Sequence, residues 1–204
     1  MSFDLVPIEE LQEILPALYK PVKEVVRRVL FPLLEDYKKF KNEQENHDPQ
    51  TDDCIREAIN MIVNESEFRK ADYIANLVRN TVLRSDSELS NSDVLVFLSD
   101  IKQMSWRQLC LLEGFRQNQT DDIEINSSSI SGLLRMEIQR LVDLGYIRVT
   151  ADELRYQTVD PKKLYLTPIG KQLCTLMELS QTPEEDIDDT FGSWGFTRKS
   201  RIQR

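Results

Sequence analysis

One stretch in the second half of the chain constrains its fold most. From Ile130 to Leu144 the apolar residues recur at helical spacing, and Gly145 follows where a helix often ends in a left-handed residue. Two short runs with alternating apolar residues, 146–150 and 164–166, are typical of β-strands and are separated by a polar segment. Thr167-Pro168 then supplies an N-cap and a first-turn proline for another helix. The order helix, strand, strand, helix predicts a small two-stranded β-hairpin between two helices.

The region before this stretch is also predicted to be helical. Apolar residues at helical spacing follow Asn91 and Ser92, and we expect one or the other of these two residues to cap a helix. Ser105 and Gln108 form a capping box, in which each side chain satisfies a backbone N–H at the start of a helix. The sequence LLRMEIQRLVDLGYIRV, followed by LYLTPIGKQL, resembles the signature shared by many bacterial winged-helix domains. We therefore expect a winged-helix-like domain over residues 91–180.

A second resemblance covers more of the chain. The segments FRKADYIANLVRNTV and VLVFLSDIKQMSWRQLCLLEGF, with the LTPIG ending, together resemble the bacterial Abi-alpha (abortive-infection alpha) family. In this family a helical layer precedes a winged-helix-like end. The resemblance implies a bacterial protein linked to phage defence that has no well-defined biochemical activity.

Residues 1–90 are expected to form a separate helical region. Apolar residues recur at helical spacing over residues 11–40, giving a wide apolar stripe. Proline lacks an N–H and clashes with the preceding turn, so two or three helical pieces joined at bends are expected here. The prolines concerned are Pro16, Pro21 and Pro32.

A polar loop is expected at about residues 38–53, because this run has almost no apolar anchors. A helical hairpin should follow, with its helices at about 52–64 and 68–82. The fold class that follows is mainly α: an N-terminal helical layer plus a C-terminal winged-helix-like module with a small two-stranded β-hairpin.

Composition limits the classes of function. The chain of 204 residues has a net charge of −9, and no segment has the dense positive charge that is typical of strong nucleic-acid binding. Its N-terminus is acidic where a signal peptide is basic, and no apolar run is long enough to cross a membrane. The three cysteines lack the spacing of a disulfide framework or a zinc site. We expect a cytoplasmic protein that needs neither metal nor cofactor.

The candidate contact residues lie in the winged-helix-like region. The helix after residue 130 and the hairpin together offer hydroxyl, amide and basic side chains that can bind phosphate or a partner protein. On the helix side these are Ser128, Ser129, Ser131, Arg135, Gln139 and Arg140, and on the hairpin they are Arg148, Arg155, Lys162 and Lys163. Neighbouring acids make this footprint sparse, so two interpretations stay open: a DNA contact, or solvated charges on a protein-binding module.

Residues 181–204 are expected to be a flexible tail that is acidic, then aromatic, then basic. Its three aromatic residues, Phe191, Trp194 and Phe196, cannot form a core by themselves. They can dock on the protein's own body or act as a short partner-binding motif.

No catalytic residue is assigned, since the chain has none of the glycine-rich loops or nucleophile and metal motifs that common enzymes carry. Residues 11–40 could lie on a membrane surface, but flanking acids such as Glu9, Glu10 and Glu13 would be repelled by anionic lipid. The sequence thus favours a non-enzymatic bacterial interaction protein that acts through protein–protein contacts and is related to phage defence. The alternative is a DNA-binding winged-helix transcriptional regulator, and self-association is open in both cases.

Overall fold

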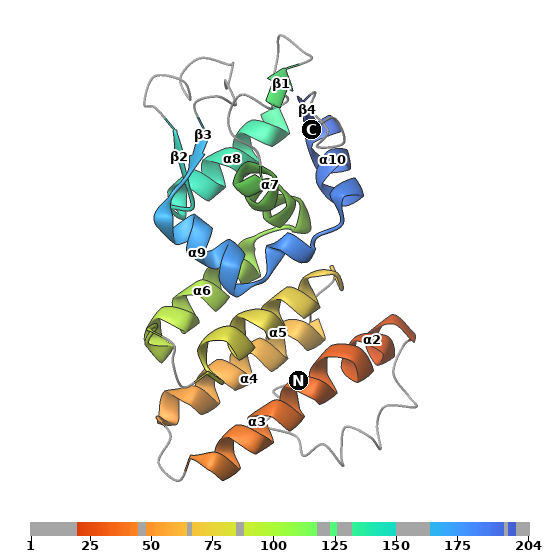
Figure 1. The fold of residues 1–204 in the computed structure, drawn as a ribbon. Helices are drawn as coiled ribbons and strands as arrows, with labels where there is room; N and C mark the ends of the chain where they lie inside the picture. The colour runs from red at the N-terminus through yellow and green to blue at the C-terminus, as the bar shows by residue number, and fades with distance from the viewer. Residues whose placement is uncertain are drawn as a thin grey trace. The chain divides into compact units, whose positions relative to one another are not determined.

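The computed structural model describes residues 20–44, 48–64, 67–84, 88–117, 123–125, 132–149, 164–193 and 196–198. This part of the chain is mainly helical, with two small antiparallel sheets of two strands each (Figure 1). The chain divides into two compact units, residues 1–103 and residues 104–204, and each is described by itself. The predicted mainly α fold with a small two-stranded hairpin is confirmed.

In the part of unit 1 that the structure describes, all regular elements are helices. These are α2 (Lys20–Val25), the π-helical turn η2 (Val26–Leu30), α3 (Phe31–Glu43), α4 (Pro49–Asn64), α5 (Lys70–Thr81) and α6 (Asn91–Gln103). Helix α4 packs against both α5 and α6. The interior between them contains fully buried side chains such as Ile55, Ile74 and Leu98, so apolar burial drives their association.

The prolines of the first helical segment do not divide its described part into separate pieces. Residues 20–43 are helical throughout, with Pro21 and Pro32 inside the run. A π turn lies directly before Pro32, where the Phe31 N–H donates to the Val26 carbonyl. Since Pro32 has no N–H and its ring needs room beside the preceding turn, the wider π turn accommodates it without a break. The predicted break is wrong here; Pro16 lies outside the described residues.

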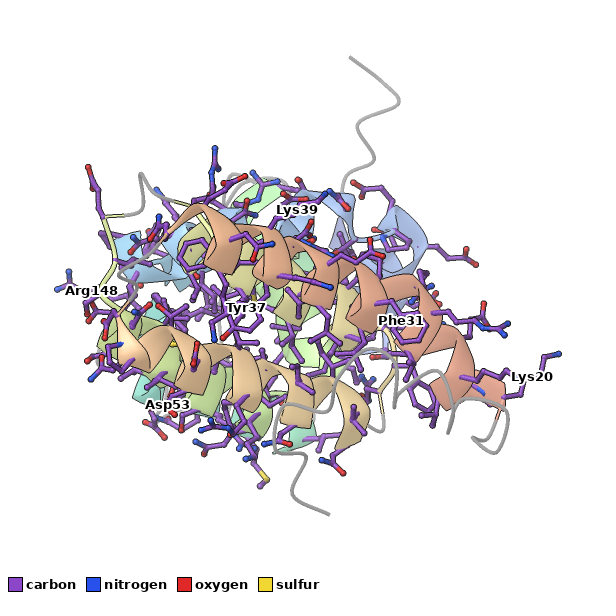
Figure 2. All side chains as sticks on the ribbon, turned by 90° about the horizontal axis from the view of Figure 1, so that it is seen from below. Lys20, Phe31, Tyr37, Lys39, Asp53 and Arg148 are labelled. Carbon is purple, nitrogen blue, oxygen red and sulfur yellow. The ribbon has the colours of Figure 1, made fainter. Side chains whose placement is uncertain are left out.

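The polar loop predicted at about 38–53 is wrong for residues 38–43 and 49–53, because α3 continues to Glu43 and α4 already begins at Pro49. Of the described residues in this range, only Gln44 and Asp48 are non-helical. Tyr37 is buried and anchors this turn of α3, while the exposed Lys38 and Lys39 form its solvated face. In the view of Figure 2, Tyr37 points toward α4, and Lys39 and Lys20 point outward. A polar run is thus compatible with a helix whose other face packs.

Helix α6 belongs to unit 1. It packs against α4 and α5, and its residues Val94, Leu98 and Ile101 are buried. Ser90 and Asp93 cap it reciprocally: the Ser90 N–H donates to Asp93 Oδ2 at 3.1 Å, and the Asp93 N–H donates to Ser90 Oγ at 3.2 Å. The division after residue 103 therefore lies one helix later than the boundary expected between residues 90 and 91.

Unit 2 combines helices with two short strand pairs. Its elements are α7 (Trp106–Gln117), β1 (Ile123–Ile125), α8 (Gly132–Asp143), β2 (Ile147–Val149), β3 (Leu164–Leu166), α9 (Pro168–Leu176), the 3-10 turn η5 (Leu179–Gln181), α10 (Glu184–Gly192) and β4 (Phe196–Arg198). Helix α7 lies at the centre, and its residues 108–115 are all buried. Both α9 and α10 pack against it.

The local signals predicted for this unit are confirmed. Ser105 and Gln108 form the capping box of α7. Gly145 has a φ of 79° after the end of α8, in the left-handed region that favours glycine. Strand β2 pairs with β3 in an antiparallel register that places Arg148 opposite Tyr165. Thr167 caps α9, with Pro168 in its first turn.

The end of the chain is not simply a flexible tail. Residues 184–192 form α10, and residues 196–198 form β4, which pairs antiparallel with β1. Ile187 and Phe191 are fully buried, and the Phe191 ring meets the Phe115 ring edge to face, with 5.5 Å between the ring centroids. The acids in the first turn of α10 suit the positive end of the helix dipole. The prediction of flexibility is therefore wrong for these described residues.

Candidate interaction surface

Helix α8 has apolar side chains on two sides. Ile138 and Leu141 are fully buried in unit 2, whereas Leu133 and Met136 are 55% and 71% exposed. Leu133, Met136 and the exposed Arg140 follow one another at spacings of three and four residues, so they share one face of the helix. We call these three residues the α8 surface. Adjoining exposed apolar side chains make this face a candidate for binding.

The β2–β3 pair presents a second set of exposed side chains. Arg148 on β2 lies directly opposite Tyr165 on β3, so the two side chains share one face of the pair. Both are exposed, Tyr165 by 50%, and Arg148 extends outward at the edge of the view in Figure 2. Ile169, which is 43% exposed, follows in the first turn of α9. An arginine beside a tyrosine ring, close in sequence to an apolar residue, is a composition typical of protein interfaces.

One side chain holds the hairpin and its flanking helices together. The Thr167 hydroxyl donates to the Gly145 carbonyl oxygen at 2.7 Å and accepts the Gly170 N–H at 3.0 Å. The Thr167 N–H donates to the Tyr146 carbonyl at 3.1 Å. At Gly170 a side chain would overlap the same carbonyl, so glycine is required for this close approach. The end of α8, the start of β2 and the start of α9 are therefore fixed to one another.

The structure places only some of the predicted contact residues. Gln139 donates to Asp143 Oδ1 at 2.7 Å, Arg140 and Arg148 are exposed, and Arg135 belongs to α8. Phe196 belongs to β4, whereas Phe191 is buried inside unit 2 and so is not a free partner-binding motif. The other predicted residues lie outside the described part: Ser128, Ser129, Ser131, Arg155, Lys162, Lys163 and Trp194.

The exposure of Leu133 and Met136 was missed from the sequence. Leu133 fits the same apolar period as Leu141, and this period alone does not distinguish an exposed residue from a buried one. The signal that could have revealed the second face is the width of the pattern, because apolar residues at 133, 136, 138 and 141 surround more of a helix than one stripe requires.

Two described thiols are poorly suited to chemistry. Burial raises the pKa of the Cys174 thiol to about 12, and the neighbouring Glu113 carboxylate adds to this rise. Burial likewise raises the pKa of Cys54 to about 11. Because the thiolate is the nucleophile and the metal ligand, both groups stay in their unreactive form at neutral pH. Within the described ranges, no group of three or more His, Cys, Asp or Glu residues is placed to hold a metal ion.

Glu113 is a buried charge at the centre of unit 2. Its carboxylate accepts two hydrogen bonds from the Arg116 guanidinium, both at 2.7 Å, and a third from Gln117 at 2.9 Å. The hydrogen bonds from Arg116 to Glu113 raise the pKa of the guanidinium. Arg116 and Gln117 lie on the same helix as Glu113, and a buried carboxylate that is hydrogen-bonded in this way is a structural ion pair.

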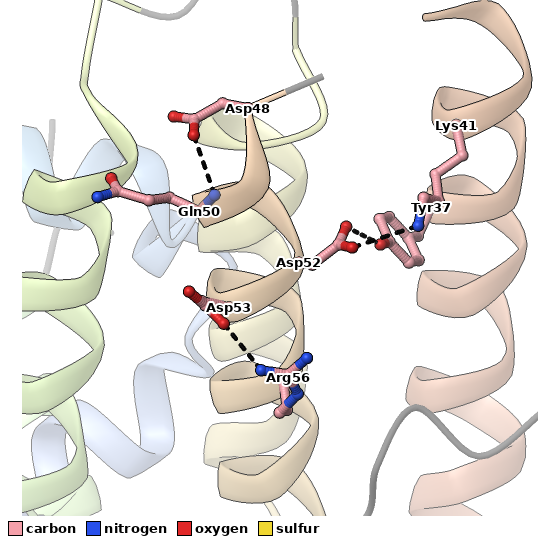
Figure 3. A network of polar contacts seen from close by, with 7 residues as sticks. All are labelled: Tyr37, Lys41, Asp48, Gln50, Asp52, Asp53 and Arg56. Atoms are coloured by element: carbon pink, nitrogen blue, oxygen red, sulfur yellow. Dashed lines mark hydrogen bonds and ion pairs between the residues drawn. The ribbon is translucent and has the colours of Figure 1, made fainter. Parts of the chain in front are cut away.

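A polar network in unit 1 connects α3 to α4 (Figure 3). The Tyr37 hydroxyl donates to Asp52 Oδ1, and Lys41 Nζ lies 3.3 Å from Asp52 Oδ2. Burial raises the pKa of Tyr37, and the hydrogen bond to Asp52 raises it further. A tyrosine held in its protonated form does not act as a base, so the network serves to join the two helices.

Comparison with known proteins adds no relative: no protein-family model, curated protein or solved structure matches this chain. Across the described residues, the structure has no helix with the length and apolar character needed to cross a membrane.

Proposed function

We propose that this protein is a non-enzymatic bacterial interaction protein, and that unit 2 is a winged-helix-like module that binds another protein. The observation that carries the proposal is the exposure of Leu133 and Met136 on α8. In a winged helix, this helix is the one that would enter a DNA groove. Base edges and phosphates are contacted mainly by polar and basic side chains, so two apolar residues on the exposed face suit a protein partner better.

The chemistry of the rest of the surface supports the same function. Arg140 completes the α8 surface, and Arg148 with Tyr165 forms a second contact point on the hairpin. Interfaces are enriched in Tyr, Met and Arg relative to the remaining protein surface. The order of α8, β2, β3 and α9 supports the winged-helix-like assignment, and the resemblance of the sequence to the Abi-alpha family supports a role in phage defence.

The experiment compares capture of partners by the full chain and two variants. In Leu133→Lys/Met136→Lys the α8 surface becomes charged. The matched control, Val96→Lys, changes an apolar side chain that is 60% exposed on α6 of unit 1. Quantitative mass spectrometry of affinity-purified complexes should show a protein retained by the wild-type chain and the control but lost from the double variant. Equal retention by all three chains would refute the α8 surface as the binding site.

The same variants distinguish self-association from the binding of a different protein. Sedimentation velocity of the purified chain measures whether it dimerises, and the double variant shows whether α8 is responsible. A dimer that persists in the double variant while partner capture is lost places the partner, and not a second copy, on the α8 surface.

DNA binding is the alternative function, favoured by the exposed Arg140 and Arg148. Fluorescence anisotropy with duplex DNA at several salt concentrations tests it, because phosphate contacts release counterions and weaken steeply with salt. Submicromolar binding that falls with salt and is lost in Arg140→Glu/Arg148→Glu would establish this alternative. Absence of binding at low salt removes it.

A further inference from the structure

A cleft of about 360 Å³ lies on unit 1 between α4 and α6. Its lining residues are Asp53, Arg56, Glu57 and Asn60 from α4, and Leu95, Ser99 and Lys102 from α6. This volume lies within the range of small-molecule sites. The cleft is unrelated to the α8 surface, which belongs to unit 2, so its role is independent of the function proposed above.

The cleft is lined by two acidic and two basic side chains, so its net charge is zero. Arg56 Nη1 lies 2.8 Å from Asp53 Oδ1, and Lys102 Nζ lies 2.9 Å from Glu57 Oε1. The first pair is drawn along α4 in Figure 3. Each basic group already has an acidic partner, so an ionic ligand would gain little from the lining. A neutral polar ligand is favoured.

Two buried polar atoms of the lining have no hydrogen-bond partner in the structure. They are Arg56 Nε, which is a donor, and Asn60 Oδ1, which is an acceptor. The two residues are four positions apart on α4, a spacing at which side chains on a helix are neighbours. Buried polar atoms are nearly always paired in proteins, because an unpaired one loses its hydration without compensation. A donor and an acceptor of the same lining, left unpaired one helical turn apart, therefore point to a ligand that pairs with both.

We propose that this cleft binds a carboxamide. The amide oxygen accepts the Arg56 Nε–H, and the amide N–H donates to Asn60 Oδ1. An amide carries an acceptor and a donor on adjacent atoms and has no charge, which matches both the unpaired atoms and the balanced lining. A nucleobase edge offers the same two groups, but none of the seven lining residues is aromatic, so a base would lack a stacking surface.

Both unpaired atoms are covered by neighbouring atoms, so binding requires a side chain to move. Of the side chains around these two atoms, those of the Asp53–Arg56 ion pair move most easily, because they are 57% and 41% exposed. Exposed ion pairs are held weakly. The Arg56 guanidinium therefore changes its rotamer when the amide binds, while Asn60 stays in place on α4.

The probe is propionamide, titrated into the ¹⁵N-labelled full chain and followed by NMR. The expected result is saturable shifts of the Arg56 Nε–H and Asn60 side-chain amide signals, with a Kd in the millimolar range, as fits so small a ligand. 2-Butanone has the same shape and accepts a hydrogen bond but cannot donate one, so its shifts should be at least about tenfold weaker at equal concentration.

Two variants and a matched control complete the test. Asn60→Leu removes the acceptor and Arg56→Lys removes the Nε donor, and each should weaken propionamide binding about tenfold or more. Asn80→Leu makes the same change as the first variant on α5, outside the lining, and should leave the Kd unchanged. Thermal unfolding of each variant confirms that it is folded.

The source of the amide is assigned by a second titration. A peptide that contains glutamine is compared with the same peptide carrying leucine in its place. Preference for the glutamine peptide over propionamide assigns the cleft to a side chain of a partner protein, and equal binding of propionamide assigns it to a free small molecule. No saturable shifts with either probe, or shifts that survive in Asn60→Leu, would overturn the proposal and leave water as the partner of the two atoms.

Discussion

The hydroxyl of Thr167 donates a hydrogen bond to the carbonyl oxygen of Gly145, with 2.7 Å between the two oxygens. Gly145 ends α8 in a left-handed conformation, and Thr167 begins α9. The two residues enclose the β2–β3 pair, so this bond closes the hairpin at its base. The same oxygen accepts the Gly170 N–H and therefore serves both as a helix cap and as a tertiary contact.

Thr167→Val should destabilise unit 2, because it keeps the shape of the side chain and removes all hydrogen bonds of the hydroxyl. We expect a loss of about 1–2 kcal/mol in the free energy of unfolding, the usual cost of losing an N-cap. Urea denaturation followed by circular dichroism measures it. Thr167→Ser is the control and should recover most of the loss, since serine retains the hydroxyl. Equal stability of the valine variant and the wild type would show that the hydroxyl does not stabilise the hairpin.

Gly114→Ala should destabilise the contact between α7 and α10. A Cβ at this position overlaps the ring of Phe191, which is fully buried, and also comes close to Ile187. Overpacking of this kind typically costs about 1–3 kcal/mol. The matched control is Gly192→Ala, where a Cβ meets nothing within 4 Å. It should be neutral or raise the stability by up to about 1 kcal/mol. Similar effects of both substitutions in urea denaturation would contradict the packing described here.

The exposed and buried faces of α8 should respond differently to lysine. Leu133→Lys/Met136→Lys replaces exposed side chains and should change the free energy of unfolding by no more than about 0.5 kcal/mol per site. Ile138→Lys places a charge in the interior and should prevent folding, because Ile138 is fully buried. Thermal unfolding distinguishes the two cases. Loss of folding in the double variant would mean that Leu133 and Met136 belong to the core.

The stability of the chain should depend on pH through Cys174. The pKa of this thiol is about 12 in the folded protein against 9.0 without burial, so above pH 9 the unfolded state releases a proton that the folded state retains. The stabilisation by the neutral thiol is therefore complete below pH 9 and is lost as the pH rises toward 12. Cys174→Ala should flatten this part of the profile, measured by urea denaturation at stepped pH. Parallel profiles for variant and wild type would contradict a buried neutral thiol.

Local signals account for what the sequence predicted well. Gly145 and Thr167-Pro168 act through backbone geometry and capping within a few residues, so the end of α8 and the start of α9 could be read directly. The continuation of α3 past residue 37 could not, because its polar face gave no apolar period. The stability of this turn comes from Tyr37 packing and bonding to Asp52 of another helix.

The features that could not be predicted from the sequence depend on tertiary contacts. Phe191 is buried because Gly114, far away in the sequence, leaves room for its ring, and no pattern near residue 191 reports that space. For the candidate surface, periodicity identified α8 but not which of its apolar residues remain exposed. That distinction depends on how much of the helix the neighbouring elements cover, which is a property of the assembled unit.

The contact between Phe191 and Gly114 can form only after nearly all of unit 2 has been synthesised. Helix α7 leaves the ribosome well before α10, so the surface that α10 covers stays open to solvent while the chain is still growing. A chain that is cut before residue 184 would keep Phe115 uncovered and carry a permanently exposed apolar surface. Nonsense or frameshift products of this kind should aggregate or be degraded rather than accumulate as shortened but working copies.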